Sequence, residues 1–262
     1  MTDTSLKYSL FKLTMIFLGG LVLLFIIAPI AGMFISNSGS GLAEVSSNKD
    51  VINSIKLTLT VSFFSTVIFA IGAIPLAYFL ARNNFWGKQI VSGIIDLPVV
   101  IPHSAAGIAL LGFVSRDTFV GKAAGAVGLD FVGHPAGIAI AMAFVSVPYL
   151  INAARDGFSA VPERLEKAAL NLGASPARVF FTIALPLAWR SILSGLILMF
   201  ARGMSEFGAV IIIAYHPMIT PVLIYEWFGA FGLDYARPVA TIFIVVCLAF
   251  FVLLRAVSSK KK

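Results

Sequence analysis

Six apolar stretches, each long enough to cross a bilayer as a helix, constrain this chain more than any other feature. A membrane-spanning helix needs about 20 consecutive, predominantly apolar residues. The stretches cover residues 13–35, 57–81, 91–114, 136–154, 184–214 and 237–257. The first exceeds the apolar core of a secretory signal and is expected to remain as an anchor. Because 59% of the 262 residues are hydrophobic and only 12% are charged, we predict an all-α integral membrane protein with six transmembrane helices.

The basic residues predict the orientation of these spans. With the N-terminus in the cytoplasm, 13 of the 19 Lys and Arg fall on the cytoplasmic side: Lys7, Lys12, Arg82, Lys88, Arg155, Arg164, Lys167, Arg178, Arg190, Arg255, Lys260, Lys261 and Lys262. Cytoplasmic loops carry an excess of Lys and Arg, so we expect a multi-pass protein of the cell membrane with both termini in the cytoplasm. The net charge of +7 then reflects this topology and not nucleic-acid binding. The terminal 260–262 run is expected to lie near anionic membrane lipid.

The connection between the fourth and fifth spans, about residues 156–182, is long for a helical bundle and has the pattern of an ordered insertion. Pro162 suits the first position of a helix. Apolar residues recur on one face of that helix at Leu165, Ala168, Ala169 and Leu172. Polar residues cover the other face at Glu163, Glu166, Lys167 and Asn171. Gly173 suits the left-handed residue that ends a helix, and Ser175 with Pro176 suits the start of a second one.

The apolar face of the first short helix is shallow, with two alanines between leucines. Small side chains allow another surface to approach closely, as a docking helix would require. The same pattern also fits an amphipathic helix that lies in the membrane interface. The residues alone leave both interpretations open.

This loop resembles the E-A-A-x3-G-x9-I-x-L-P pattern of the inner-membrane permeases of ATP-binding-cassette (ABC) importers. Six positions fit at full spacing: Ala168, Ala169, Gly173, Ile183, Leu185 and Pro186. The Glu position of the pattern holds Lys167 instead, and Glu166 is one residue early. The resemblance covers essentially the whole chain. It implies a single permease domain over residues 1–262, with the type I ABC importer fold, that works as a homodimer.

In that family the loop is the coupling helix, which fits a cleft in a separate ATPase subunit. The resemblance therefore implies docking of two ATP-binding cassette subunits on the homodimer, through Arg164, Leu165, Lys167, Ala168, Ala169, Leu170, Gly173, Ala174, Ser175 and Pro176. The sequence contains no G-x4-G-K-[ST] phosphate-binding loop, since Gly121-Lys122 is followed by Ala. We therefore expect a transport subunit and no enzyme, with ATP and Mg bound by the partner. No cofactor or metal is expected in this chain, because it has one Cys and three scattered His.

Two interrupted spans supply candidates for a translocation path. Arg202 and Glu206, four residues apart in the fifth span, are costly at membrane depth, so they either neutralise each other or face a watery path. In the third span Pro98 and Pro102 interrupt the helix, and Ser104 is expected to cap a helix beyond the break. His103 is expected to be a neutral, hydrogen-bonded core residue. The candidate path or gate residues are Pro98, Pro102, Ser104, Arg202, Ser205, Glu206, Phe207 and Gly208.

Three segments resemble the oxyanion-importing branch of these permeases: D-L-P-x-V-x-P at 96–102, S-E-F-G-A at 205–209 and AYHPMITPVLIYE at 214–226. The last looks most similar to molybdate/tungstate members, and the family receives its ion from an extracellular or periplasmic binding protein. A permease for sulfate or another oxyanion is the alternative. A secondary transporter or channel is a rival of another class. It would be expected to show an internal repeat or a chain of intramembrane acidic residues, and the sequence shows neither.

Overall fold

The computed structural model of the protein describes residues 3–259, so the basic run at 260–262 lies outside the described residues. Between residues 3 and 259 the chain is helical, with no strand. The helices are α1 (Asp3–Ile35), α2 (Gly39–Ser47), α3 (Lys49–Arg82), α4 (Lys88–Val100), α5 (His103–Val114), α6 (Phe119–Ala126), α7 (Pro135–Ala160), α8 (Glu163–Asn171), α9 (Pro176–Val179), the π-helical turn η1 (Phe180–Ala184), α10 (Leu185–Met204), α11 (Val210–Ile213), α12 (Thr220–Phe231) and α13 (Leu233–Ser259). The prediction of an all-α protein is confirmed.

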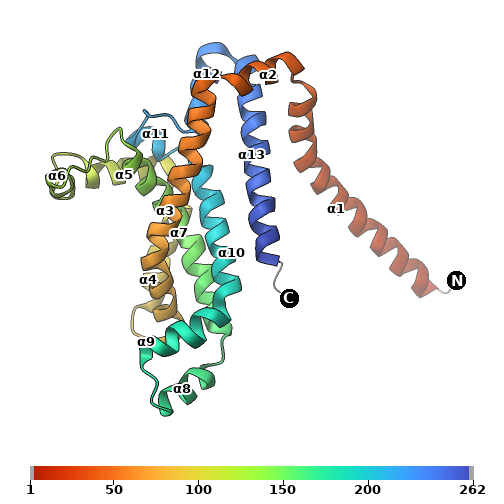
Figure 1. Ribbon diagram of the computed structural model, residues 1–262. Coiled ribbons are helices and arrows are strands. Elements are labelled where there is room, and N and C mark those ends of the chain that lie inside the picture. Colours follow the sequence, from red (N-terminus) through yellow and green to blue (C-terminus); the bar gives the residue numbers. More distant parts are fainter. Residues whose placement is uncertain (1–2, 260–262) are drawn as a thin grey trace.

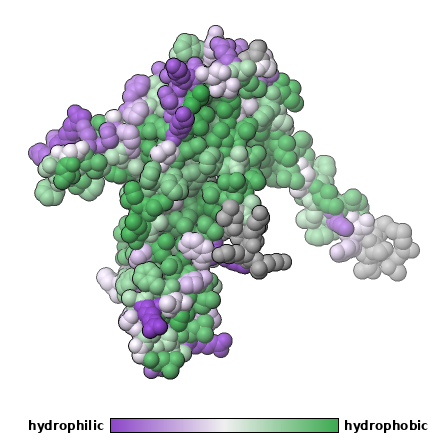
Figure 2. All heavy atoms as spheres, in the orientation of Figure 1, coloured by the Kyte–Doolittle hydropathy of each residue, from purple (hydrophilic) through white to green (hydrophobic). Residues whose placement is uncertain are grey.

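Five helical segments in the described chain are long and apolar enough to cross a membrane, or six if the bent α4–α5 pair counts as one span. The predicted spans 13–35, 57–81, 136–154 and 237–257 each lie within one long helix, namely α1, α3, α7 and α13. Hydrophobic residues cover the middle of the molecule, and hydrophilic residues gather at its two ends and on a side arm (Figure 2). This distribution is that of a protein whose middle lies in lipid.

The predicted third span, residues 91–114, is not one continuous helix. It consists of α4 and α5, which meet at an angle of 112°. Ile101 separates them with φ −72° and ψ 149°, because Pro102 disfavours a helical conformation in the residue before it. At about 1.5 Å per residue, α4 alone is about 20 Å long and too short for a hydrocarbon core of about 30 Å. The chain therefore enters the membrane region on α4 and turns sideways into α5.

The predicted fifth span, residues 184–214, begins earlier and ends earlier than expected. A continuous helix runs over Pro176–Met204, through α9, η1 and α10. Its π-helical turn directly precedes Pro186, whose ring would clash with the carbonyl of Thr182 in a regular α-helix, so the wider turn accommodates it. The helix ends at Met204, and the chain continues through an irregular stretch at 205–209 into α11.

The core of the bundle is the packing of α3, α7 and α10. Its buried cluster includes Ala77 and Leu80 of α3, Ala154 and Phe158 of α7 and Ile192 of α10. Small residues at these contacts allow helices to approach closely, which is the usual way that helices associate in a membrane. This three-helix core holds the irregular segments at one level and the α8–α9 loop at one end.

Two elements leave the bundle in opposite directions (Figure 1). The apolar window of α1 is 0% buried, and the helix slants away from its neighbours. On the other side α5 and α6 form a projecting arm, while α2 and α12 cover the end of the bundle opposite α8 (Figure 1). The start of α1 and the end of α13 both point toward the end that carries α8, as both termini on one side of a membrane would require.

Candidate functional site

The two irregular segments that interrupt the third and fifth spans contact each other. A Cβ at Gly208 would lie 2.8 Å from Cβ of His103, at the start of α5. A Cβ at Gly107 would lie 2.9 Å from Cα of Ala209. Only glycine allows the backbone to come this close at either position. The break after α10 therefore rests directly on the first turns of α5, and the polar residues of both breaks meet.

Glu206 is the centre of this polar cluster and is fully buried, with 0% exposure. Its Oε2 accepts a hydrogen bond from Nη2 of Arg202 at 2.9 Å and lies 2.9 Å from Nδ1 of His103. Its Oε1 accepts a bond from the backbone N–H of Ala209 at 2.9 Å. Every oxygen of this buried carboxylate thus has a partner, which burial of a charge requires. Arg202 and Glu206 are paired, which was one of the two alternatives that the sequence left open, and Glu206 lies beyond the helix end and not within the helix.

His103 lies within hydrogen-bond distance of both Arg202 and Glu206. Its Nδ1 lies 2.9 Å from Oε2 of Glu206 and 2.8 Å from Nη2 of Arg202. Its Nε2 also lies 2.9 Å from Nη2 of Arg202. With the proton on Nδ1, the neutral ring donates to the carboxylate through Nδ1 and accepts from the guanidinium through Nε2. The expectation of a hydrogen-bonded core residue holds only in part, because 37% of the His103 side chain is exposed. Its proximity to Glu206 was not predicted from the sequence.

Arg202 has one side toward the buried carboxylate and one side toward open space. Its side chain is 20% exposed. Its Nη1 donates to Oγ of Ser205 at 3.3 Å, and Ser205 is itself exposed. The Ser205 hydroxyl donates in turn to the carbonyl of Arg202 at 3.1 Å. The exposed edge of this cluster therefore presents the guanidinium of Arg202, which can contact an anion.

The remaining path candidates do not all join this cluster. Pro98 is buried, Pro102 is an exposed residue at the start of α5, and the ring of Phe207 packs on Tyr225 at 5.1 Å between centroids. Ser104 does not cap α5 as predicted. The helix begins at His103, with Pro102 in the cap position and no side-chain hydrogen bond there, so the exposed Ser104 already lies within the first turn.

The loop at the other end of the molecule has the predicted short helices. Gly173 lies just after the end of α8 and has a φ of +86°. This left-handed conformation is unfavourable for residues other than glycine. Ser175 Oγ accepts a bond from the backbone N–H of Arg178 at 3.3 Å, and Pro176 occupies the first position of α9. Pro162 lies one position earlier than predicted, because it precedes α8 as its cap residue.

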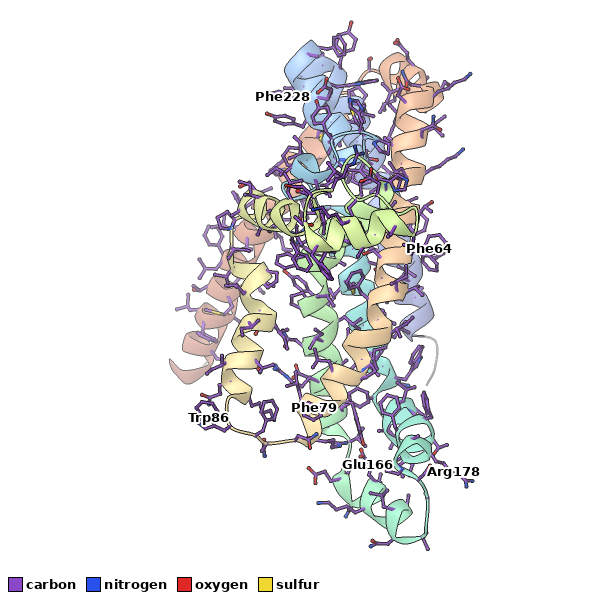
Figure 3. All side chains as sticks on the ribbon, turned by 90° about the vertical axis from the view of Figure 1, so that its left-hand side faces the viewer. Phe64, Phe79, Trp86, Glu166, Arg178 and Phe228 are labelled. Carbon is purple, nitrogen blue, oxygen red and sulfur yellow. The ribbon has the colours of Figure 1, made fainter. Side chains whose placement is uncertain are left out.

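The predicted faces of α8 need one correction. Glu166 was expected on the polar face, but its side chain is only 8% exposed. Arg82 donates to its Oε1 through Nη2 at 2.5 Å and Nε at 3.0 Å, and the hydroxyl of Tyr78 donates to its Oε2 at 2.7 Å. Figure 3 shows Glu166 between α8 and the ends of the bundle helices, whereas Arg178 points outward. The sequence gives no local signal for this contact, because Arg82 is far away along the chain.

Three leucine side chains in or directly after α8 are exposed. Leu165 is 42% exposed, Leu170 44% and Leu172 89%. Lys167, at the position where the family pattern has Glu, is exposed and pairs with Glu163 at 2.8 Å. The hydrogen bond and charge of Lys167 lower the pKa of the Glu163 carboxyl below its usual value. The other predicted docking residues, Arg164, Ala168, Ala174, Ser175 and Pro176, are exposed or half-buried, as is Ala169. The loop thus exposes a surface to solvent, while Glu166 attaches it to the end of α3.

Comparison with known proteins gives this geometry a context. Residues 73–261 match the protein family described as binding-protein-dependent transport system inner membrane component. The chain is 42% identical over 235 residues to the molybdate/tungstate transport system permease protein WtpB of Methanocaldococcus jannaschii. The aligned residues make up 90% of this chain and 92% of that protein. It is also 42% identical over 161 residues to the molybdenum transport system permease protein ModB of Haemophilus influenzae, over 61% of this chain and 70% of that protein.

A solved structure shares the fold. The crystal structure of a bacterial ABC transporter involved in the import of the polysaccharide alginate matches with a TM-score of 0.76, over 98% of this chain and 99% of that chain. The two sequences are 19% identical, so the likeness concerns the arrangement of helices.

Proposed function

This chain belongs to the family of inner membrane components of binding-protein-dependent transport systems, and we propose that it is the permease subunit of an importer for molybdate or tungstate. It is a membrane-spanning transport component and not an enzyme, with the fold of an ABC importer permease. The observation that carries the substrate proposal is the 42% identity to a molybdate/tungstate permease over nine-tenths of both chains.

The proposed path for the ion passes the polar cluster at the breaks. A tetrahedral dianion needs hydrogen-bond donors and positive charge, and the exposed edge of the Arg202 guanidinium supplies both. Glu206 already neutralises part of the charge of Arg202, so an ion there is held weakly and can leave, as conduction requires. Selectivity between similar oxyanions then lies mainly with an external binding protein.

The proposed partners follow from the two ends of the molecule. We assign the α8 end to the cytoplasm, because most Lys and Arg of the connections lie there, and the α2–α12 end to the outside. Two ATP-binding subunits then dock at α8 of a homodimer, against the exposed Leu165 and Ala168 and the half-buried Ala169. The exposed α1 provides an apolar surface for lipid or for the second copy of the chain.

Transport into sealed vesicles tests this function. The permease is reconstituted with its ATPase subunit and binding protein, and uptake of labelled molybdate is measured with and without ATP. We expect ATP-dependent uptake that unlabelled tungstate inhibits more strongly than sulfate. Stronger inhibition by sulfate would assign the chain to a sulfate importer. Uptake that follows an ion gradient without ATP would contradict the whole proposal and favour a secondary transporter.

A further inference from the structure

We propose that the buried contact of Glu166 with Arg82 and Tyr78 is the mechanical link through which movement of α8 reaches α3. We name these three residues the clamp. This inference rests on the proposed function, because it concerns how a displacement made by the ATPase subunit would enter the membrane helices.

Glu166 is the one buried residue of α8. Every other residue of this helix is exposed or half-buried, so no apolar cluster fixes α8 to the bundle. A carboxylate at 8% exposure with three donors within 2.5–3.0 Å is therefore the main side-chain attachment of the helix. A push or pull on α8 can act through this group, through the contacts of α8 with α9 and η1, or through the backbone on either side, and of these only Glu166 connects α8 to α3 by side-chain hydrogen bonds.

The clamp brings four elements together: α3, α7, α8 and η1. Besides Glu166, Nη2 of Arg82 donates to the backbone carbonyl of Val161 at 3.1 Å, at the end of α7. The ring of Tyr78 packs edge-on against Phe158 of α7 at 5.2 Å and against Phe180 of η1 at 4.9 Å. Arg82 and Tyr78 are one turn apart on the last turns of α3. Glu166 thus bonds to α3 at a site where α7 and η1 already contact the side chains of Arg82 and Tyr78.

The backbone route from α8 to α10 is less suited to carry the movement. It passes through Leu172 to Ser175, where Leu172 is 89% exposed and a Cβ on Gly173 would meet nothing within 4 Å. It then passes through the π-helical turn before it reaches α10. A turn without packed side chains bends before it transmits force, whereas a close-packed contact transmits displacement.

The receiving helix spans the whole molecule. The 34 residues of α3 correspond to about 50 Å at 1.5 Å per residue. At its far end Thr58 donates to Ser54 O at 2.7 Å and lies 3.1 Å from the hydroxyl of Thr220, while it accepts from the backbone N–H of Thr220 at 2.9 Å. Since Thr220 begins α12, a tilt of α3 at the clamp is transferred to the outer end of the protein.

The test measures ATP hydrolysed per ion imported by the complete transporter in vesicles. Glu166→Gln keeps the size of the side chain but removes its charge. We expect uptake to fall about tenfold while ATP hydrolysis and retention of the ATPase subunit stay close to wild type, so the ATP-to-ion ratio rises. Glu163→Gln is the matched control, because it removes the exposed carboxylate of the same helix, and its ratio is expected to equal that of the wild type.

Two further variants separate transmission from folding or docking. Tyr78→Phe removes one hydrogen bond to Glu166 but keeps the aromatic packing, so a smaller rise in the ratio is expected. The exchanged pair Arg82→Glu with Glu166→Arg restores opposite charges and is expected to bring the ratio back toward wild type. An unchanged ratio in Glu166→Gln, or no recovery in the exchanged pair, overturns the proposal.

Loss of the ATPase subunit from Glu166→Gln also overturns it, because Glu166 would then serve docking. These outcomes differ from a failure of the proposed function, since only the wild-type transporter bears on which ion is imported. If the wild type imports another ion, the same ratio is measured with that ion.

Discussion

The protein buries an Arg–Glu pair in two places, and the two pairs differ in what they connect. Arg202 and Glu206 are four residues apart, and Glu206 also accepts a bond from its own segment at Ala209. Arg82 and Glu166 are 84 residues apart and join α3 to α8. The first pair fixes the shape of one irregular segment. The second fixes the position of one element relative to another.

This difference predicts different consequences when a partner is removed. A lone buried charge is costly because neither water nor a counter-charge compensates it. At the breaks the surrounding helices are packed on both sides, so the cost falls on the stability of the membrane domain. At the clamp α8 can move away and expose the charge to water. We therefore expect the transfer of movement from α8 to α3 to be lost while the membrane domain stays stable. The variants below test this division, starting with the largest effect.

The largest effect is expected for Glu206→Leu. It leaves Arg202 without its carboxylate in the membrane region and should cost about 3–5 kcal/mol of stability. We expect the melting temperature in detergent, followed by tryptophan fluorescence, to fall by several degrees and uptake to disappear. Glu206→Gln, which retains acceptor and donor atoms, is the control with a smaller loss. A Leu variant that melts at the wild-type temperature would show that the pair does not stabilise the break.

Ala169→Trp should abolish uptake without affecting stability. Ala169 lies half-buried on α8, next to the exposed leucines, and a large side chain there would block a close-fitting partner. Uptake and co-purification of the ATPase subunit are both expected to be lost, while the melting temperature stays unchanged. Ala169→Ser adds only a hydroxyl and should retain transport. Normal uptake by the Trp variant would exclude this face as the docking surface.

An intermediate effect is expected for Gly107→Ala. The added Cβ would lie 2.9 Å from Cα of Ala209 and 3.0 Å from its carbonyl oxygen, so the two breaks must separate. Overpacking of this kind costs about 1–3 kcal/mol. The control is Gly112→Ala in the same helix, where a Cβ meets nothing within 4 Å. Only the first variant should lower the melting temperature, and equal melting of the two would show that the breaks are not in close contact.

The smallest effect concerns the exposed pair of Glu163 with Lys167. Lys167 lowers the pKa of Glu163, so the pair stabilises the folded protein above the usual Glu pKa of about 4.3 and loses this contribution as the pH falls through the lowered pKa. Lys167→Gln should melt slightly below wild type at neutral pH. Melting curves recorded at decreasing pH should converge once Glu163 is protonated. A difference that widens on acidification would contradict the sign of this shift.

Local features of both regions could be predicted from the sequence. The spacing of Arg202 and Glu206 implied their pairing, and Gly173, Ser175 and Pro176 implied the turn after α8. Each depends on residues within one or two helical turns. The four uninterrupted spans followed in the same way from the length of their apolar runs.

Contacts between distant segments could not be predicted. The burial of Glu166 depends on where the end of α3 lies, and the contact of His103 with Glu206 depends on a 112° bend at Ile101. Two prolines indicated that the third span is interrupted, but they carry no information about the direction of the next helix. The early end of the fifth span at Met204 was missed because an apolar run resumes at 209–214, directly after the short stretch that contains Ser205 and Glu206.

The π-helical turn at Phe180–Ala184 lies between α9 and α10 in one continuous helix, and it determines how α9 is rotated about the helix axis relative to α10. A π-turn holds one residue more than an α-helical turn, and each residue of an α-helix corresponds to a rotation of about 100°. Deleting a single residue there would remove the wide turn that accommodates Pro186, and it would change how α9 and the preceding α8 are placed about the axis of α10. The direction in which α8 projects from the bundle therefore depends on the number of residues in this turn, separately from the side chains of α8 itself.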